Sequence, residues 1–171
     1  TRLEAGAIAP NASPHDLGEI VGSALQRAAR VLSHHEVEVD LAKDLPMLEL
    51  DAVLFEQVLF NLLDNASKYA PEGTTVRVEG WRDGTAVYLQ VVDEGEGIPA
   101  DDLERIFDKF YRAQKGDRVR AGTGLGLAIS RGFVEAMAGT IAAANRTDRP
   151  GAVFTIRLPV PAQPRQLDTA A

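Results

Sequence analysis

The stretch FNLLDNASKY, residues 60–69, contains the pattern that decides the fold prediction. Its polar residues Asn61, Asn65 and Lys68 are four and three positions apart, which places them on one face of an α-helix. The same face is apolar one turn earlier, at Val58. Amide oxygens are ligands that suit Mg²⁺, and a lysine beside them suits phosphate. The stretch therefore predicts a magnesium and phosphate site, with two asparagines that bond only nearby backbone as the alternative.

The segments around this stretch predict a mixture of helices and strands. Asp51 can cap a helix that runs from about 52 to 69, because Pro71-Glu72-Gly73 then stops it. Further helices are expected at 17–32, 101–106 and 123–137, and strands at 37–41, 47–50, 74–82, 85–93, 139–145 and 152–159. Two hairpin-like strand pairs break a strict alternation of strand and helix, so we expect an α+β fold. It would be a two-layer α/β sandwich, a mixed sheet with helices packed on one face.

The composition of the chain bounds its class. With 171 residues, of which 45% are hydrophobic and 25% charged, the chain fits a single globular domain. Cysteine is absent, which excludes disulfides, thiolate metal ligands and a cysteine nucleophile, and fits a cytoplasmic domain. The net charge of −7 disfavours general binding to nucleic acid or anionic membrane, so neither is expected as a partner. No apolar run approaches the ~18 residues of a membrane-spanning helix.

A second candidate site is the turn DEGEGIP, residues 93–99. Asp93 continues the inward face of the strand before it, and a buried carboxylate is costly unless a group donates to it. The amino group of an adenine could be that donor. Gly95 and Gly97 permit close approach of a ligand or positive φ angles. The alternative is a plain acidic turn.

A third candidate site is GTGLGL, residues 122–127, which opens a predicted helix. Glycines at a helix N-terminus expose backbone N–H groups to an anion such as phosphate. The stretch lacks the Gly-Lys-Ser/Thr of a P-loop and the preceding strand of a dinucleotide fingerprint. The alternative is a glycine-rich helix start that allows close packing.

The segment before these glycines is basic. Residues 108–121 contain five basic and two acidic side chains in a chain that is acidic overall. A basic segment between two glycine motifs suits a lid over polyphosphate, with Arg112 or Arg118 offsetting negative charge. The alternative is a solvated charged loop.

Taken in order, these four motifs resemble the N, G1, F and G2 boxes of the sensor histidine kinase ATP-binding domain. This is the Bergerat-type fold, which gyrase and Hsp90 also use. The resemblance covers about residues 17–160. The runs from Leu48 to Pro71 and from Phe107 to Arg131 look like the potassium-responsive Kdp-type sensor kinases in particular.

The resemblance implies ATP and Mg²⁺ as cofactors and assigns roles to residues. Asn61, Asn65 and Lys68 would be catalytic, with Asn65 holding Mg²⁺, Asn61 near the phosphates and Lys68 on phosphate. Asp93 would accept from the adenine amino group, and Phe107 would help to anchor the lid. Further nucleotide-binding residues would be Tyr69, Gly95, Gly97, Ile98, Phe110, Arg112, Gly122, Thr123, Gly124, Leu125, Gly126, Leu127 and Thr155, the last as a pocket wall.

The activity that the resemblance implies is transfer of the ATP γ-phosphoryl to a histidine on a dimerisation domain, then to an aspartate of a response regulator. His15 begins a stretch that lacks the Arg and Pro usual around the acceptor histidine. We therefore expect the acceptor upstream, and a chain that binds ATP–Mg without labelling itself. Residues 1–16 would be the end of a dimerisation helix and a linker, and 161–171 a frayed tail. The parent would be a homodimer in a bacterial inner membrane, with no membrane contact by this part.

Two alternatives to the kinase remain. An ATP-hydrolysing member of the fold would carry a glutamate four residues before the magnesium-binding asparagine, where this chain has Asn61. The nearest acid upstream, Glu56, would point about 140° away from Asn61 on a helix. The second alternative is a regulatory module that binds nucleotide and transfers nothing.

Overall fold

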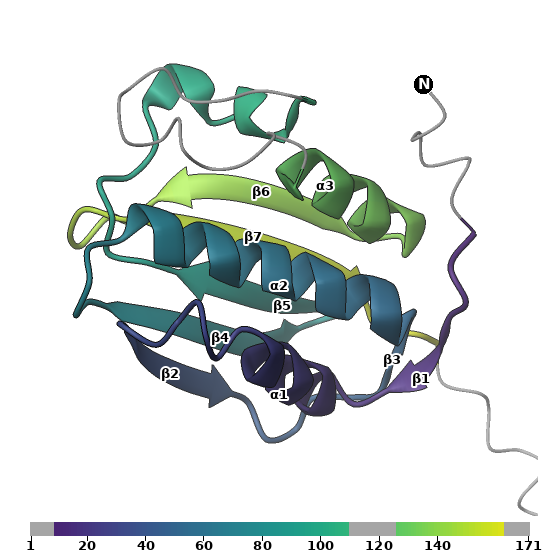
Figure 1. Cartoon of the computed structure of the whole chain (residues 1–171). Coiled ribbons are helices and arrows are strands. Elements are labelled where there is room, and N and C mark those ends of the chain that lie inside the picture. Colours follow the sequence, from purple (N-terminus) through teal and green to yellow (C-terminus); the bar gives the residue numbers. More distant parts are fainter. Residues whose placement is uncertain (1–8, 110–125, 163–171) are drawn as a thin grey trace, which may run out of the picture.

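The structure is a computed structural model that describes residues 9–109 and 126–162. Three α-helices and seven strands form the described part of the chain (Figure 1). The helices are α1 (Leu17–Arg27), α2 (Ala52–Tyr69) and α3 (Gly126–Ala136). The strands are β1 (Ser13–His15), β2 (Glu36–Leu41), β3 (Leu48–Leu50), β4 (Thr75–Asp83), β5 (Ala86–Val92), β6 (Thr140–Asn145) and β7 (Ala152–Pro159).

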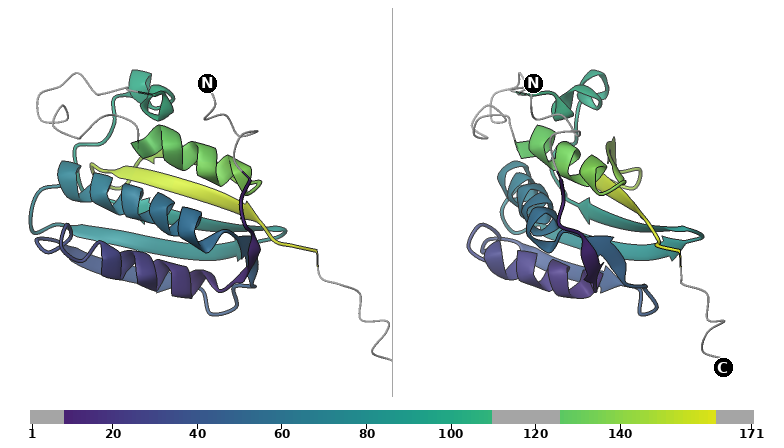
Figure 2. Two further views of the ribbon diagram at one scale, coloured as in Figure 1. Left: turned by 45° about the vertical axis from the view of Figure 1, so that its right-hand side comes forward. Right: turned by 90° about the vertical axis from the view of Figure 1, so that its right-hand side faces the viewer.

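Five strands form a mixed sheet in the order β2-β4-β5-β7-β6. β2 runs parallel to β4, and the other neighbours are antiparallel. All three helices lie on one face of this sheet, so the molecule has two layers (Figure 2). The predicted α+β sandwich is therefore confirmed.

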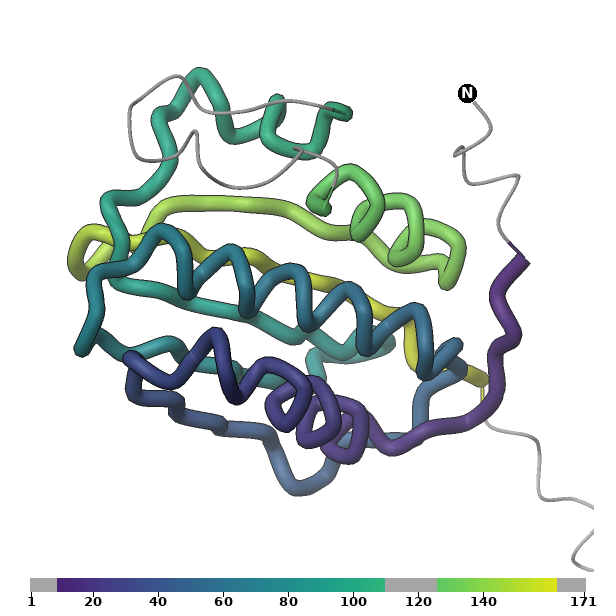
Figure 3. Tube along the Cα trace, in the orientation of Figure 1, coloured from purple at the N-terminus to yellow at the C-terminus, as the bar shows by residue number. Residues whose placement is uncertain are grey.

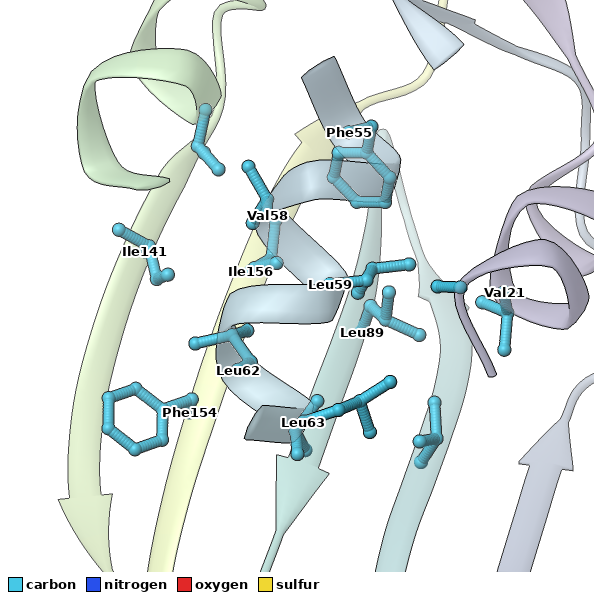
Figure 4. Packing of buried hydrophobic residues seen from close by; sticks show 14 of the residues in the cluster. Val21, Phe55, Val58, Leu59, Leu62, Leu63, Leu89, Ile141, Phe154 and Ile156 are labelled. Atoms are coloured by element: carbon cyan, nitrogen blue, oxygen red, sulfur yellow. The ribbon is translucent and has the colours of Figure 1, made fainter. Parts of the chain in front are cut away.

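Helix α2 crosses the middle of the sheet and carries much of the core. The Asp51 side chain caps it, since Oδ1 accepts from the backbone N–H groups of Val53 and Leu54, at 3.1 Å each. Its apolar residues recur every three or four positions and point at the sheet (Figure 4). Phe55, Val58, Leu59, Leu62 and Leu63 are buried there. Asn61, Asn65 and Lys68 follow on a less buried side.

Helix α1 ends five residues earlier than predicted, at Arg27 rather than residue 32. The turns that follow still bury Ala28 and Leu32. The apolar spacing therefore continues beyond the helix, which is why periodicity alone overestimated its length. The predicted helix at 101–106 is instead two short 3₁₀ helices, η2 (Ala100–Asp102) and η3 (Arg105–Phe107).

Strand β1 lies in the stretch 1–16 that the sequence predicted as helix end and linker. It pairs antiparallel with β3 in a separate two-stranded sheet, so β3 does not join the main sheet. The sequence of β1, Ser-Pro-His, is too short to show an alternating pattern. Just before β1, the Asn11 backbone N–H donates to Oδ2 of Asp51 at 2.8 Å. The incoming chain is thus hydrogen-bonded to the residue that caps α2, and its trace passes the start of that helix (Figure 3).

The second face of the main sheet, here called the open face, carries no helix formed by residues 9–109 or 126–162 (Figure 2). Trp81 and Tyr88 stack on neighbouring strands, with ring centroids 5.6 Å apart. β2 is an end strand of the sheet, and its acidic residues Glu36, Glu38 and Asp40 are all exposed. Glu38 lies opposite Arg77, which places it on the open face.

Candidate functional site

Asp93 directly follows β5 and is only 3% exposed, as its inward position in the strand pattern predicts. Its Oδ1 accepts from the backbone N–H groups of Gly95, at 2.8 Å, and Ala152, at 3.1 Å. These donors offset part of the cost of burying the carboxylate. The group is therefore a fixed acceptor at the rim of the core, not an exposed turn residue.

The two glycines of the Asp93 turn are required by their surroundings. A Cβ at Gly95 would lie 2.7 Å from the carbonyl oxygen of Tyr69, so the turn packs directly against the end of α2. Gly97 has a φ of +86°, which side chains rarely adopt, and a Cβ there would lie 2.7 Å from Oδ1 of Asn145. The close approach at Gly95 brings the Asn65–Lys68 end of α2 next to Asp93.

Asn145 and Arg146, at the end of β6, support this turn from the other side. The Asn145 amide accepts from Ile98 N–H and donates to the Ile98 carbonyl, both at 2.7 Å. Nη1 of Arg146 donates to the Asp93 carbonyl oxygen at 3.2 Å. Sequence reasoning missed both residues. The available signal was two polar residues at a strand end, just before the turn signal Pro150-Gly151.

Arg146 is itself held by an acidic neighbour. Nε and Nη2 of Arg146 donate to the two carboxylate oxygens of Asp148, each at 3.0 Å. This paired hydrogen bond raises the pKa of Arg146 and lowers the pKa of the Asp148 carboxyl. Both side chains therefore stay charged around neutral pH.

Asn61 connects α2 to α3. Its Nδ2 donates to Oγ of Ser130, at 3.0 Å, and to the carbonyl oxygen of Gly126, at 3.2 Å. Its Oδ1 accepts from Nε2 of Gln57 at 2.8 Å. The predicted site residues Asn61 and Gly126 are thus in direct contact, which joins the first and third candidate motifs.

Asn65 and Lys68 lie further along α2, near its C-terminal end. Asn65 is half-buried, and its side-chain amide has no hydrogen bond to any residue within 9–109 or 126–162. Lys68 forms an ion pair with Asp64 one turn earlier, Nζ to Oδ2 at 3.0 Å. A hard amide oxygen and an ammonium group therefore lie on the helix that abuts the Asp93 turn, a donor set that fits a magnesium–nucleotide complex.

Glu56 faces away from this cluster, as the helical geometry predicts. Its Oε1 accepts from Oγ of Ser23, on α1, at 2.7 Å. Asn61 instead contacts α3, on another side of α2. The Glu56 carboxylate is therefore not positioned to activate a water beside Asn65.

Phe107 ends η3 and is buried against β7. Its ring lies edge-on to Phe154, with centroids 6.3 Å apart, and the guanidinium of Arg131 lies 5.5 Å from its centroid. This position fits the predicted anchor at the start of the basic segment. The predicted site residues Phe110, Arg112, Gly122, Thr123, Gly124 and Leu125 lie outside the described residues, while Gly126 and Leu127 begin α3.

Thr155 does not belong to the cluster, and its prediction as a pocket wall was wrong. Its Oγ1 accepts from Nε2 of Gln90, at 2.9 Å, on the open face of the sheet. Side chains alternate along a strand, and it is Ala152 and Phe154 that face the helices. Ala152, three residues earlier, is the β7 residue that contacts Asp93.

Two further features of the described residues bear on function. They contain no group of three or more His, Asp or Glu side chains that could hold a metal ion. In the same parts of the chain, none of the helices has the length and apolar character needed to cross a membrane.

Comparison with known proteins identifies the family. Residues 50–162 match the family described as histidine kinase-, DNA gyrase B-, and HSP90-like ATPase. The chain belongs to this family. The sensor protein KdpD of Escherichia coli is 43% identical over 143 residues, which cover 84% of this chain but 16% of that protein. The chain thus spans about a sixth of the length of this relative.

Solved structures agree with this assignment. The mycobacterial sensor histidine kinase MprB has a TM-score of 0.76 and 30% identity, covering 88% of this chain and 99% of that one. Full-length ShkA in complex with AMPPNP has a TM-score of 0.77 and 27% identity, covering 95% of this chain and 35% of that one. The chain is a histidine kinase ATP-binding catalytic domain of the sensor-kinase type, and therefore a nucleotide-binding domain.

Proposed function

We propose that this domain binds ATP with Mg²⁺ and donates the γ-phosphoryl group to a histidine on a dimerisation domain outside the described residues. The phosphoryl group would then pass to an aspartate of a response regulator. The observation that carries the proposal is the buried Asp93 carboxylate, fixed by two backbone N–H groups beside the end of α2. An acceptor held in this way suits the amino group of an adenine.

The residues around Asp93 bind different parts of the nucleotide. Asp93 accepts from the adenine, and the Gly95–Gly97 turn with Ile98 shapes the base pocket. Lys68 lies toward phosphate, and Asn65 supplies an amide oxygen for Mg²⁺. The bound ion would bridge phosphate oxygens and offset their charge. Tyr69 flanks the nucleotide, since its carbonyl contacts Gly95.

Two groups of residues outside the described ranges complete the proposal. Backbone N–H groups of residues 122–125, just before α3, approach the phosphates. Phe110 helps Phe107 to anchor a lid, on which Arg112 or Arg118 stabilises the developing negative charge.

The surroundings of Asn61 favour phosphoryl transfer over hydrolysis. An amide is a poor base, and Glu56 is bonded to Ser23 on α1. ATP should therefore survive on the domain until an acceptor histidine arrives. A hydrolysis rate on the order of 1 s⁻¹ by the isolated chain would contradict this proposal and favour an ATPase.

The parent protein is proposed from its relatives. The 43% identity to a KdpD sensor protein supports a potassium-responsive sensor kinase of Kdp type. Such a parent would be a homodimer in a bacterial inner membrane, with this domain on the cytoplasmic side. No nucleic acid partner is proposed, because the chain is acidic.

The test is calorimetric titration of the 171-residue chain with the ATP analogue AMP-PNP, with and without Mg²⁺. We expect binding that Mg²⁺ strengthens. With labelled ATP, the chain alone should acquire no label, whereas an added dimerisation domain should. A folded chain that does not bind millimolar AMP-PNP, or that labels itself at His15, would overturn the proposal.

A further inference from the structure

A series of side-chain hydrogen bonds links all three helices. Nη2 of Arg27, on α1, donates to Oε1 of Gln57 at 2.8 Å. Nε2 of Gln57 donates to Oδ1 of Asn61 at 2.8 Å. Nδ2 of Asn61 then donates to Oγ of Ser130 and to the carbonyl of Gly126, on α3. We call these five residues the helix relay.

The hydrogen bonds of the helix relay all run in one direction, because each residue determines whether the next must present a donor or an acceptor. A guanidinium can only donate, so Arg27 requires that Gln57 presents its oxygen to α1. The Gln57 NH₂ group then faces Asn61, which must answer with its own oxygen. The Asn61 NH₂ group is therefore turned toward α3. The opposite orientation would set its oxygen against the carbonyl of Gly126.

The far end of the relay lies at the start of α3. Gly126 is the first described residue of that helix, and Ser130, one turn later, is completely buried. Asn61 thus contacts the first turn of α3 at two points. Gly126 is itself one of the glycines that the family resemblance assigns to the nucleotide. Rotation of the Asn61 amide would therefore change the hydrogen bonds that hold the start of α3 against α2.

The near end of the relay is fixed by packing. The Arg27 guanidinium lies 4.4 Å from the centroid of the Phe60 ring, a cation–π contact that limits where its hydrogen bonds point. Phe60 and Gln57 are neighbours on α2, three residues apart. Arg27 is therefore held in place before it meets Gln57.

We propose that Gln57 is a positioning residue of the nucleotide site. By fixing which way the Asn61 amide faces, it holds the N-terminal end of α3 in the orientation that binds phosphate. Gln57 acts through Asn61 and need not touch the nucleotide. This inference rests on the proposed function, because it assumes that nucleotide binds beside α2 and α3.

The test is the variant Gln57→Glu in the 171-residue chain. Glutamate keeps the size of the side chain and strengthens its bond with Arg27, but its carboxylate cannot donate to Asn61. The Asn61 amide should then turn over and face Gly126 with its oxygen. We expect affinity for AMP-PNP with Mg²⁺ to fall about fivefold, the worth of about one hydrogen bond. The melting temperature without nucleotide should stay within about 3 °C of wild type.

The matched control is Ser23→Ala. It removes a second side-chain hydrogen bond between α1 and α2, from Ser23 to Glu56, without changing any residue of the helix relay. Its nucleotide affinity should equal that of wild type. A spectroscopic readout separates positioning from stability, since the ¹⁵N–¹H signals of the Asn61 side-chain amide should shift in Gln57→Glu and not in Ser23→Ala.

The outcomes are distinguishable. If wild type does not bind AMP-PNP, the proposed function fails and the inference fails with it. If wild type binds and Gln57→Glu binds equally well, or if Ser23→Ala weakens binding as much, only the inference is overturned. Should Gln57→Glu unfold, Ser130→Ala replaces it, because it removes the acceptor at the far end of the relay. Unchanged affinity in Ser130→Ala would then overturn the inference.

Discussion

Asn145 satisfies both backbone polar groups of Ile98, through two hydrogen bonds of 2.7 Å from a single side-chain amide. The amide takes the place of a neighbouring strand for a residue that lies outside the sheet. It fixes the end of the turn that begins at Asp93. The position of the proposed base pocket is thus set by a strand end more than forty residues away in the chain.

The variant Asn145→Ala should loosen this turn. Losing both bonds to Ile98 should lower the free energy of unfolding by about 1–2 kcal/mol. It should also weaken AMP-PNP binding several-fold, because the pocket wall is no longer held. Urea denaturation and calorimetric titration measure the two effects. Asn145→Asp, which retains only the acceptor, should be no better than alanine, and a wild-type affinity in both variants would contradict the role.

Asp93→Asn should weaken nucleotide binding and leave the fold intact. The amide oxygen can still accept hydrogen bonds from the N–H groups of Gly95 and Ala152, so the free energy of unfolding should change by no more than about 1 kcal/mol. The new NH₂ group, however, is a donor where the proposed adenine amino group also donates. We expect a loss of affinity of about tenfold or more by titration. An unchanged affinity would make Asp93 a structural turn residue only.

Gly151→Ala should be far more damaging than Gly73→Ala. Both glycines have positive φ, +152° at Gly151 and +88° at Gly73, but of the two only Gly151 has an added Cβ that would clash, with the Asp93 carbonyl oxygen. Gly73 has nothing within 4 Å of that position. By urea denaturation, we expect the free energy of unfolding to fall by about 1 kcal/mol in Gly73→Ala and by about 3 kcal/mol or more in Gly151→Ala. Equal losses of stability in the two variants would mean that the β6–β7 turn can shift to accommodate the Cβ without displacing Asp93.

Thr155→Val tests the corrected position of Thr155. The change removes the hydrogen bond from Gln90 on the open face, which should cost at most about 1 kcal/mol of stability. Nucleotide affinity should not change, because the side chain points away from Asp93. A clear loss of AMP-PNP affinity in a stable variant would restore Thr155 to the pocket wall.

The sequence alone was sufficient to predict the bounds of α2 and the burial of Asp93. The bounds of α2 were predicted closely because Asp51 caps its start and Pro71 follows its end. The burial of Asp93 followed from its place in the alternation of β5. In both cases the signal is local, since caps and alternation act over a few residues.

The errors came from contacts that are not local. β1 exists because it pairs with β3, more than thirty residues away, and its own residues carry no signal. Asn145 and Arg146 act on a turn that the chain left long before them. Thr155 was placed by a motif when the alternation of Phe154 and its neighbours already pointed it to the open face. Strand alternation was the more reliable physical signal there.

The acidic end strand β2 also bears on how copies of this domain behave in a crowded cell. A sheet edge offers unpaired backbone groups onto which another strand can add, and aggregation often begins in this way. If two copies joined through β2, Glu36, Glu38 and Asp40 of each would face the same carboxylates of the other. The repulsion disfavours such pairing, although Val37 and Val39 beside these residues are apolar and exposed. The sheet is therefore protected from growing into a fibre at this edge.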